Sequence, residues 1–189
     1  MCGFFNFFKK NQIIFKKKEG FSKRCSIVYT VEQSGVKWRI KYKGDFMFLG
    51  QYEHSIDEKG RLIVPAKYRE PLGDNFIITF GLDTCLFVYP LEEWKNLSEK
   101  MKLLPLGQKD ARAFKRILFS RATDCTMDNQ GRVIIMKYLR DYARINKEIM
   151  VIGVSDRVEI WSKDVWQKYF EEVENSYEDI AERIYEQEG

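Results

Sequence analysis

The chain has a single histidine among 189 residues, His54, and this scarcity excludes most of the usual catalytic centres. Histidine is the side chain best suited to proton transfer near neutral pH, and it is also the commonest metal ligand. A Ser-His-Asp or Cys-His centre would have to use His54, yet no nucleophile partner is evident for it. We therefore interpret His54 as a residue at a strand edge and expect no enzymatic activity.

Cysteine is also sparse, and its spacing excludes the common metal and redox motifs. Cys2, Cys25, Cys85 and Cys125 lie far apart in the sequence and form no CxxC pair. Without a second histidine they do not match the ligand pattern of a zinc site. We expect four reduced thiols, no metal and no cofactor, as is typical of a cytoplasmic protein.

Long apolar runs are absent as well. No stretch of 18 or more apolar residues occurs, so the sequence predicts no membrane span. The apolar stretches within residues 1–18 are too short and too interrupted for a secretory signal. With 44% hydrophobic residues and only 4 prolines, the chain should instead form a soluble, packed globular protein.

Charge is distributed unevenly along the chain. Residues 1–46 carry 11 basic and 3 acidic side chains, whereas residues 164–189 carry 9 acidic and 2 basic ones. The intervening residues 47–163 have 19 basic and 16 acidic side chains, a net charge of only +3. Any anion-binding surface must therefore be local.

Residues 1–46 are interpreted as a basic leader that precedes the natural start at Met47. They lack a sustained period of 2 or 3.6, and strongly patterned sequence begins at Met47. Back-translation of Lys43–Met47 permits AGGGGA just ahead of an ATG, which resembles a bacterial ribosome-binding site. Back-translation of Val31–Arg39 permits GTGGAG, GTGGGG and GTGGAG, with starts about ten bases apart, one turn of B-DNA. We interpret this leader as an operator read as protein, and the alternative interpretation is a disordered basic leader.

The remaining sequence is an internal repeat. His54–Pro65 aligns with Cys125–Met136 at an offset of 71, and both segments read Asp-x-x-Gly-Arg followed by aliphatic residues. The offset becomes 72 further on, where Phe80–Trp94 aligns with Ile152–Trp166. We therefore predict two equivalent halves, residues 47–118 and 119–189, the first with a linker helix and the second with an acidic C-terminal helix.

Each half is predicted to contain a hairpin, a short helix and a second hairpin, which gives a mainly β protein with short helices, of the α+β class. A unit of about 45 residues buries too little apolar surface to be stable alone, so the halves must intertwine. The expected strands are Ser55–Ile56, Leu62–Val64, Asn75–Phe80 and Cys85–Tyr89, and the expected helices are Pro65–Pro71, Leu91–Leu104, Ala111–Phe119 and Val165–Tyr185.

The repeated motif predicts a DNA-reading surface. Gly60 and Gly131 would keep each turn slim, and Asp57 and Asp128 would orient Arg61 and Arg132 through charge-assisted hydrogen bonds. A β-ribbon with arginine at its tip fits the major groove, where arginine can bond guanine O6 and N7. The phosphates would be held by the neighbouring basic residues Lys59, Lys67, Arg69, Lys137, Arg140 and Arg144.

At these residues the sequence resembles the MraZ family of bacterial regulators, within the AbrB/SpoVT-like swapped-hairpin superfamily. The resemblance covers Met47 to about Tyr185, and it also rests on Met47-Phe-Leu-Gly-Gln-Tyr and on Gly153-Val-Ser-Asp-Arg-Val-Glu-Ile-Trp161. It implies two swapped-hairpin halves that form one barrel with peripheral helices, and a closed ring of many subunits. Two positions depart from the repeat: Met136 stands where the first half has Pro65, and Gln130 replaces Lys59, so we expect a weaker grip by the second half.

The resemblance also implies the ligand. Family members bind short GTGG-type direct repeats in double-stranded DNA upstream of their own gene, in the division and cell-wall gene cluster, and usually repress transcription. The implied DNA contacts are Asp57, Lys59, Arg61, Asp128 and Arg132. The resemblance therefore also implies that the protein is cytoplasmic and associated with the nucleoid.

Three alternatives stay open at this point. The chain could be a ring-forming scaffold whose ligand is a protein, with the arginine loops contacting acidic partners. It could be an antitoxin-type relative, although that class usually has a disordered C-terminal arm and this tail has helical spacing. An enzyme is the least favoured alternative, since Asp57 or Asp128 would have to act without histidine.

Overall fold

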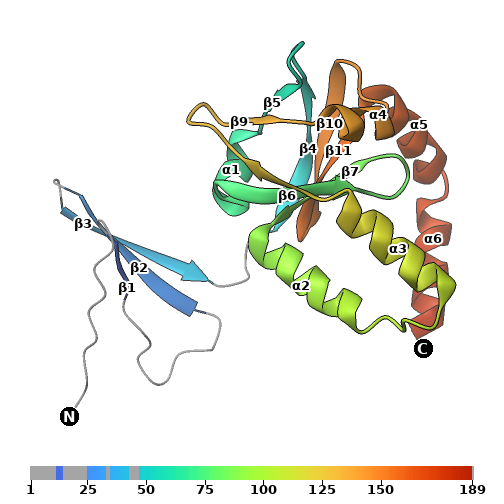
Figure 1. Cartoon of the computed structure of the whole chain (residues 1–189), viewed down its shortest axis with the longest axis horizontal. Helices are drawn as coiled ribbons and strands as arrows, with labels where there is room; N and C mark the ends of the chain where they lie inside the picture. Colours follow the sequence, from blue (N-terminus) through green and yellow to red (C-terminus); the bar gives the residue numbers. More distant parts are fainter. Residues whose placement is uncertain (1–11, 15–24, 33–34, 43–46, 189) are drawn as a thin grey trace. The chain divides into compact units, whose positions relative to one another are not determined.

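The computed structural model describes residues 12–14, 25–32, 35–42 and 47–188, and it divides the chain into two compact units, Met1–Phe46 and Met47–Gly189. In the first unit three strands form an antiparallel sheet in the order β1-β2-β3 (Figure 1): β1 (Gln12–Ile14), β2 (Cys25–Glu32) and β3 (Gly35–Tyr42). The sequence shows no sustained period here, but β2 is rich in β-branched and aromatic residues, which favour strands. The start at Met47 stays a prediction.

The second unit is an α+β structure in which one order of elements occurs twice, as predicted. Strands, helices and connections follow each other in the same sequence in both halves. The first half contains β4 (Phe48–Ser55), β5 (Arg61–Ile63), α1 (Ala66–Leu72), β6 (Asn75–Phe80), β7 (Leu86–Pro90), α2 (Leu91–Lys102) and α3 (Lys109–Ser120). The second contains β8 (Thr123–Thr126), β9 (Arg132–Ile134), α4 (Lys137–Tyr142), β10 (Glu148–Ser155), β11 (Arg157–Ser162), α5 (Lys163–Glu174) and α6 (Tyr177–Glu188).

Each half gives its first strand to the sheet of the other half. β4 pairs with β10 along its whole length, and β8 pairs with β6, so both exchanges follow the same rule. The resulting antiparallel sheet has the order β4-β10-β11-β7-β6-β8. At its centre β7 and β11 pair symmetrically, with Leu86 opposite Ile160 and Val88 opposite Val158. The predicted intertwining of the halves is therefore an exchange of strands.

A second, two-stranded sheet joins the motif segments of the two halves. β5 pairs with β9 so that Leu62 lies opposite Val133, and Arg61 and Arg132 lie opposite the isoleucines of the other strand. Leu62 and Val133 are equivalent under the 71-residue offset, so the pseudo-twofold axis passes between them. Among the described residues no ladder joins β4 to β8, and the predicted barrel is not closed by backbone hydrogen bonds.

One hydrophobic core serves both halves. The first half contributes buried residues such as Leu62 and Tyr68, and the second contributes Ile135 and Leu139, all at most 1% exposed. The Tyr68 hydroxyl donates to the carbonyl oxygens of Leu49 (3.1 Å) and Gly50 (2.8 Å), which fixes α1 against β4. Neither half could bury these side chains alone, because the opposing surface belongs to its twin.

Several boundaries differ from the predicted ones. The first hairpin is reduced to one bridge between Ile56 and Leu62, because its strands pair across the halves instead. The predicted helix Val165–Tyr185 is two helices, α5 and α6, with a break at residues 175–176. The predicted helix end at Pro71 was also wrong, because Pro71 lies in the last turn of α1, which ends at Leu72. The division into residues 47–118 and 119–189 stays a prediction.

Met136 occupies the place of Pro65 without altering the backbone. Pro65 precedes α1 with φ −50° and ψ 133°, and Met136 precedes α4 with φ −56° and ψ 147°. The departure from the repeat therefore changes the residue type and leaves the path of the chain unchanged.

No helix among the described residues is long and apolar enough to cross a membrane.

Replacement of Gly153 by alanine should destabilise the strand exchange. A methyl group on Gly153 would lie 2.4 Å from the backbone nitrogen of Leu49 and from the carbonyl carbon of Phe48, so β4 would have to move away from β10. We expect a loss of about 1–3 kcal/mol in unfolding free energy, as for other overpacked sites, measured by urea denaturation at fixed protein concentration. Gly107→Ala is the matched control, since no atom lies within 4 Å of the added methyl group. Equal midpoints for the two variants would contradict this account.

Candidate nucleic-acid interface

The first motif folds into a closed loop around the carboxylate of Asp57. Its Oδ1 accepts hydrogen bonds from the backbone nitrogens of Lys59 and Arg61, both at 2.9 Å, and its Oδ2 accepts from Arg61 Nε at 2.6 Å. The backbone closes the same loop, because Gly60 N donates to Asp57 O and Asp57 N donates to Arg61 O. The predicted Asp–Arg hydrogen bond is confirmed, and it leaves the two terminal guanidinium nitrogens of Arg61 without a hydrogen bond to the described residues.

The second motif repeats this geometry. Asp128 Oδ1 accepts from the backbone nitrogens of Gln130 and Arg132 at 2.9 Å, and its Oδ2 accepts from Arg132 Nε at 2.8 Å. Gln130 thus makes the same backbone contact as Lys59 and differs from it in its side-chain charge. The exposed fractions also agree: the two arginine side chains are 33% and 31% exposed, and the two aspartates 41% and 42%.

Glycine is required in both loops by the backbone. Gly60 and Gly131 each have φ +77°, a conformation that residues with a Cβ rarely adopt. Both glycines are buried, and each carbonyl oxygen accepts a hydrogen bond from the other half: Ile135 N donates to Gly60 O, and Val64 N donates to Gly131 O, both at 2.8 Å. Each loop is therefore hydrogen-bonded to the other half of the protein.

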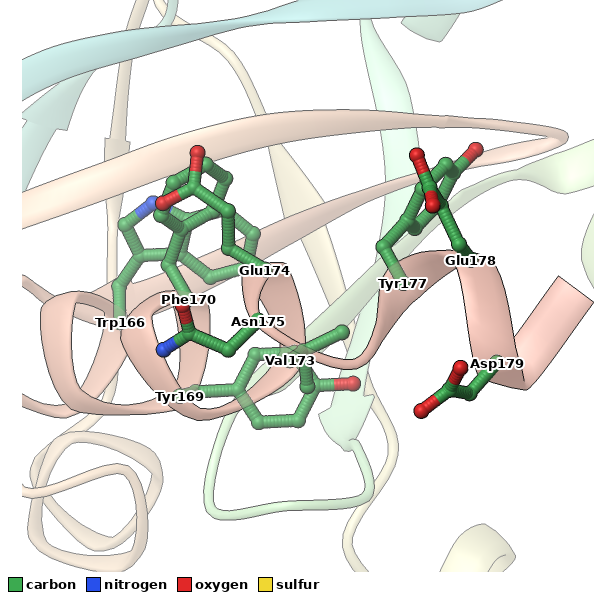
Figure 2. A pocket seen from close by; sticks show the side chains of 9 residues that line it. All are labelled: Trp166, Tyr169, Phe170, Val173, Glu174, Asn175, Tyr177, Glu178 and Asp179. Atoms are coloured by element: carbon green, nitrogen blue, oxygen red, sulfur yellow. The ribbon is translucent and has the colours of Figure 1, made fainter.

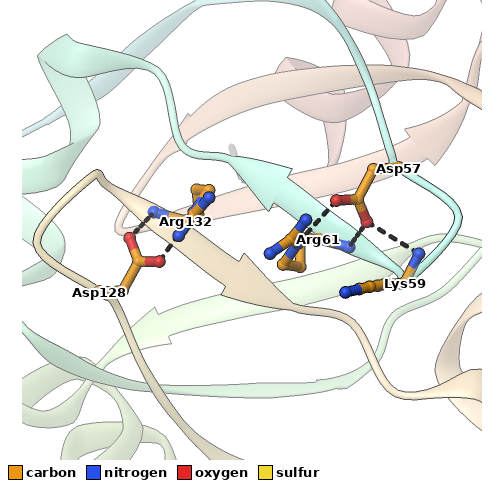
Figure 3. A network of polar contacts seen from close by, with 5 residues as sticks. All are labelled: Asp57, Lys59, Arg61, Asp128 and Arg132. Atoms are coloured by element: carbon orange, nitrogen blue, oxygen red, sulfur yellow. Dashed lines mark hydrogen bonds and ion pairs between the residues drawn. The ribbon is translucent and has the colours of Figure 1, made fainter.

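The two arginines lie on the same exposed face of the β5–β9 ribbon. Side chains alternate across a strand, so the buried Leu62 and Val133 face the core. The opposite face consists of Arg61, Ile63, Arg132 and Ile134. Figure 3 shows the two Asp–Arg pairs at the two ends of this ribbon, with both guanidinium groups on one side. The prediction that the two arginines share one direction is confirmed.

Ile63 and Ile134 also belong to this surface, although they were not predicted there. They are 49% and 53% exposed, although both lie in aliphatic runs typical of buried strands. The register explains their exposure: each lies directly opposite an arginine of the other strand, on the same face. The signal was present in the repeat, since both positions follow the motif arginine by two residues.

Both aspartates are held in the ionised form. The backbone amide of Arg61 that donates to Asp57 is the main cause that lowers the pKa of this carboxyl, followed by the Arg61 guanidinium. The pKa of Asp128 is lowered in the same way by the backbone amide and side chain of Arg132. A carboxylate that accepts several N–H bonds favours its charged form. Each loop therefore keeps an anion that fixes an arginine at neutral pH.

The remaining predicted site residues fall into two groups. Four of them are exposed: Lys59 within the first loop, Lys67 on α1, Lys137 on α4 and Arg144 just after α4. Lys137 forms an ion pair with Asp141 at 2.7 Å. Arg69 and Arg140 are only partly exposed, and each directs Nε to a backbone carbonyl of its own half: Arg69 to Val64 O at 2.9 Å and Arg140 to Ile135 O at 3.1 Å. The structure thus brings Arg69 and Arg140 to the bases of the loops and does not place them on the ribbon face.

A groove between α5 and α6 has a different character. Figure 2 shows its lining, in which aromatic side chains such as Trp166, Tyr169 and Tyr177 lie beside the acidic side chains of Glu174 and Glu178. Negative charge at this groove opposes contact with phosphates. The tail was predicted as one acidic helix, and the groove lies where that helix is instead divided into α5 and α6.

The groups considered for catalysis lie in other environments. His54 is on β4 opposite Ile149, and burial, with a smaller contribution from the charge of Arg69, lowers its pKa. Cys85 and Cys125 are buried free thiols, and burial raises the pKa of Cys125 to about 11 and that of Cys85 further. Cys2 lies outside the described residues. Within the part of the chain that the structure describes, no cluster of three or more histidine, cysteine, aspartate or glutamate residues could hold a metal ion.

Comparison with known proteins places this architecture in one family. The family model described as "MraZ protein, putative antitoxin-like" matches the chain twice, at residues 47–117 and 118–187. Relatives named "Transcriptional regulator MraZ" share 56% identity over 138 residues in Caldanaerobacter subterraneus subsp. tengcongensis and in a Thermoanaerobacter species. The relative with this name in Natranaerobius thermophilus shares 55%. Each alignment covers 73% of this chain and 96% of the relative.

The two matches of the family model follow the two structural halves, and each contains one Asp-x-x-Gly-Arg loop. The relatives are regulators of transcription by name, and they align over nearly their whole length. The family resemblance predicted from the motif is confirmed, and the chain belongs to the MraZ family.

Proposed function

We propose that this protein is a transcriptional regulator that binds double-stranded DNA sequence-specifically through the exposed face of the β5–β9 ribbon. The observation that carries the proposal is the pair of arginines on this face, each fixed by its aspartate at Nε and with its terminal nitrogens making no hydrogen bond to the described residues. The relatives' name supports the regulatory role. A β-ribbon is narrow enough for the major groove, where base edges are distinguishable.

The geometry suggests how the ribbon reads a sequence. The terminal nitrogens of Arg61 and Arg132 can donate in parallel to guanine O6 and N7. Because Asp57 and Asp128 already hold the guanidinium planes, less side-chain entropy is lost on binding. Lys59 is exposed within the first loop and Lys67 is exposed on α1, and both would contact phosphates. The second loop has Gln130 in place of Lys59 and would contribute less to backbone attraction.

The proposal extends to tandem sites and to assembly. We propose that the protein forms a closed homo-oligomeric ring and binds GTGG-type direct repeats in the promoter of its own division and cell-wall gene cluster as a repressor. Several equivalent ribbons on one ring could contact repeats at the same time, and the second contact would then be intramolecular. Nucleoid association would follow from DNA binding of this kind.

Replacement of Arg61 by alanine should abolish most of the sequence preference. We expect affinity for a duplex with three GTGGAG-type repeats to fall by about 5- to 150-fold, the value of one bidentate arginine–guanine contact. Arg132→Ala should act in the same direction, and fluorescence anisotropy at fixed salt would measure both. Lys168→Ala, which removes an equal charge from α5, is the control and should change affinity little. Equal affinity for repeat and scrambled duplexes in the wild type would instead favour the protein-binding scaffold.

Repeat number and spacing should control affinity. A duplex with three repeats about ten base pairs apart presents them on one face of the helix, whereas insertion of about five base pairs rotates one repeat to the opposite face. We expect strong binding to the first duplex, and weak binding to the second and to a single repeat. Comparable affinities for one and three repeats would refute simultaneous contact by several ribbons.

Asp57→Asn tests whether the carboxylate orients the arginine. The one side-chain oxygen of asparagine can still accept from the two backbone amides, but the oxygen that accepts from Arg61 Nε is replaced by an NH2 donor. We expect DNA affinity to fall, but less than in Arg61→Ala. The lowered pKa keeps both aspartates ionised at neutral pH. Their contribution to DNA affinity is therefore fully present above the ordinary carboxyl pKa, and it is lost only when the pH falls through the pKa of the folded protein. Wild-type affinity should therefore stay constant between about pH 6 and 8, and a marked change in that interval would contradict this role.

A further inference from the structure

Arg69 and Arg140 each contact the glycine of the opposite half's loop. A methyl group placed on Gly131 would lie 2.5 Å from both Cζ and Nε of Arg69, so the Arg69 guanidinium occupies the space beside this glycine. A methyl group on Gly60 would lie 3.1 Å from Cζ and Nε of Arg140. Arg69 and Arg140 are equivalent under the 71-residue offset. The same contact therefore occurs twice, and each time it crosses between the halves.

A short chain of hydrogen bonds reinforces each contact. Arg69 Nε donates to Val64 O at 2.9 Å, and the nitrogen of the same Val64 donates to Gly131 O at 2.8 Å. In the other direction, Arg140 Nε donates to Ile135 O at 3.1 Å, and Ile135 N donates to Gly60 O at 2.8 Å. Each arginine thus makes two contacts. It is hydrogen-bonded to the residue that binds the opposite loop, and it packs beside the glycine of that loop.

The glycine is the part of the loop on which the aspartate–arginine pair depends. Gly131 N donates to Asp128 O, and Gly131 directly precedes Arg132, whose backbone nitrogen donates to the Asp128 carboxylate. A shift of Gly131 would therefore move the Arg132 amide away from Asp128 and release the guanidinium. The planar guanidinium of Arg69 limits this shift because it lies against the glycine where no side chain is present.

We propose that Arg69 and Arg140 are positioning residues, each of which holds the arginine loop of the opposite half in its binding conformation. Arg69 acts on the loop of Asp128 and Arg132, and Arg140 acts on the loop of Asp57 and Arg61. Each half therefore contains the support for the other half's reading arginine. The effect on DNA rests on the function proposed above, whereas the effect on loop order does not.

A phosphate-binding role for Arg69 makes a different prediction. An arginine that contacts only phosphate would leave both loops unchanged in the free protein, and its removal would reduce the salt dependence of DNA binding by about one counterion per contact. A positioning arginine changes the opposite loop before any DNA is present. Hydrogen exchange in the free protein separates these roles.

The first experiment measures amide hydrogen exchange by mass spectrometry on the full chain without DNA, in Arg69→Ala, Arg140→Ala and Lys67→Ala. We expect Arg69→Ala to accelerate exchange in peptides that contain Gly131 and Arg132 and to leave those with Gly60 and Arg61 unchanged. Arg140→Ala should give the reverse pattern. Lys67→Ala, which removes an exposed charge from the same helix as Arg69, should alter neither loop. Acceleration in the arginine's own half, or in neither loop, would overturn the proposal.

The second experiment is a double-mutant cycle on DNA affinity. Once Arg132 has been removed, loss of Arg69 should cost little more, whereas Arg69→Ala and Arg61→Ala should act additively. The opposite pattern, with Arg69 coupled to Arg61, would overturn the proposal that each arginine supports the loop of the opposite half. If Arg69→Ala fails to fold, Arg69→Lys replaces it in both experiments, because lysine keeps the charge without the planar group. If no variant or wild-type protein binds DNA, the proposed function fails, while the exchange experiment still decides the present proposal.

Discussion

The exchange of strands across the pseudo-twofold axis is the constraint on which the rest of the structure depends. β4 completes its hydrogen bonds with β10, and β8 with β6, so neither half has a complete sheet of its own. The core contains side chains from both halves in one cluster. A unit of this length cannot remove enough apolar surface from water alone. Folding and the formation of the arginine surface are therefore one event.

The same constraint determines the geometry of the surface. Because β5 and β9 pair about the axis between Leu62 and Val133, two identical loops end on one face of one ribbon. Their carbonyls are bonded to the opposite half, so the relative position of Arg61 and Arg132 follows from the strand register. A single loop on a separate domain would have the same local hydrogen bonds, but no second arginine would lie at a fixed position relative to it. The duplication thus converts a local turn motif into a two-point surface.

Charge has a local role in this protein. The formal net charge is only +4, and the groove between α5 and α6 is lined by the acidic Glu174, Glu178 and Asp179. The arginines are held by ionised aspartates whose pKa values are lowered by backbone amides. This arrangement reduces the net charge at each loop, and it gives the guanidinium groups a defined orientation. Such an orientation favours recognition of planar acceptor pairs more than general attraction to anions.

The sequence by itself determined the repeat, the α+β class, the two glycine turns and the Asp–Arg pairs. The turns and the Asp–Arg pairs depend on contacts between residues at most four positions apart, such as Asp57 with Arg61, and the fold class depends on periodicity within each element. The repeat is visible when the sequence is compared with itself. Only the tertiary structure decided which strands pair, that Ile63 and Ile134 are exposed, and that Arg69 and Arg140 support the opposite loops. An aliphatic run predicts a strand but does not identify the strand with which it pairs. Backbone donors and acceptors are the same in every residue except proline, so they do not distinguish one partner strand from another. The partner is selected by the burial of side chains that are distant in the chain, which no local pattern contains.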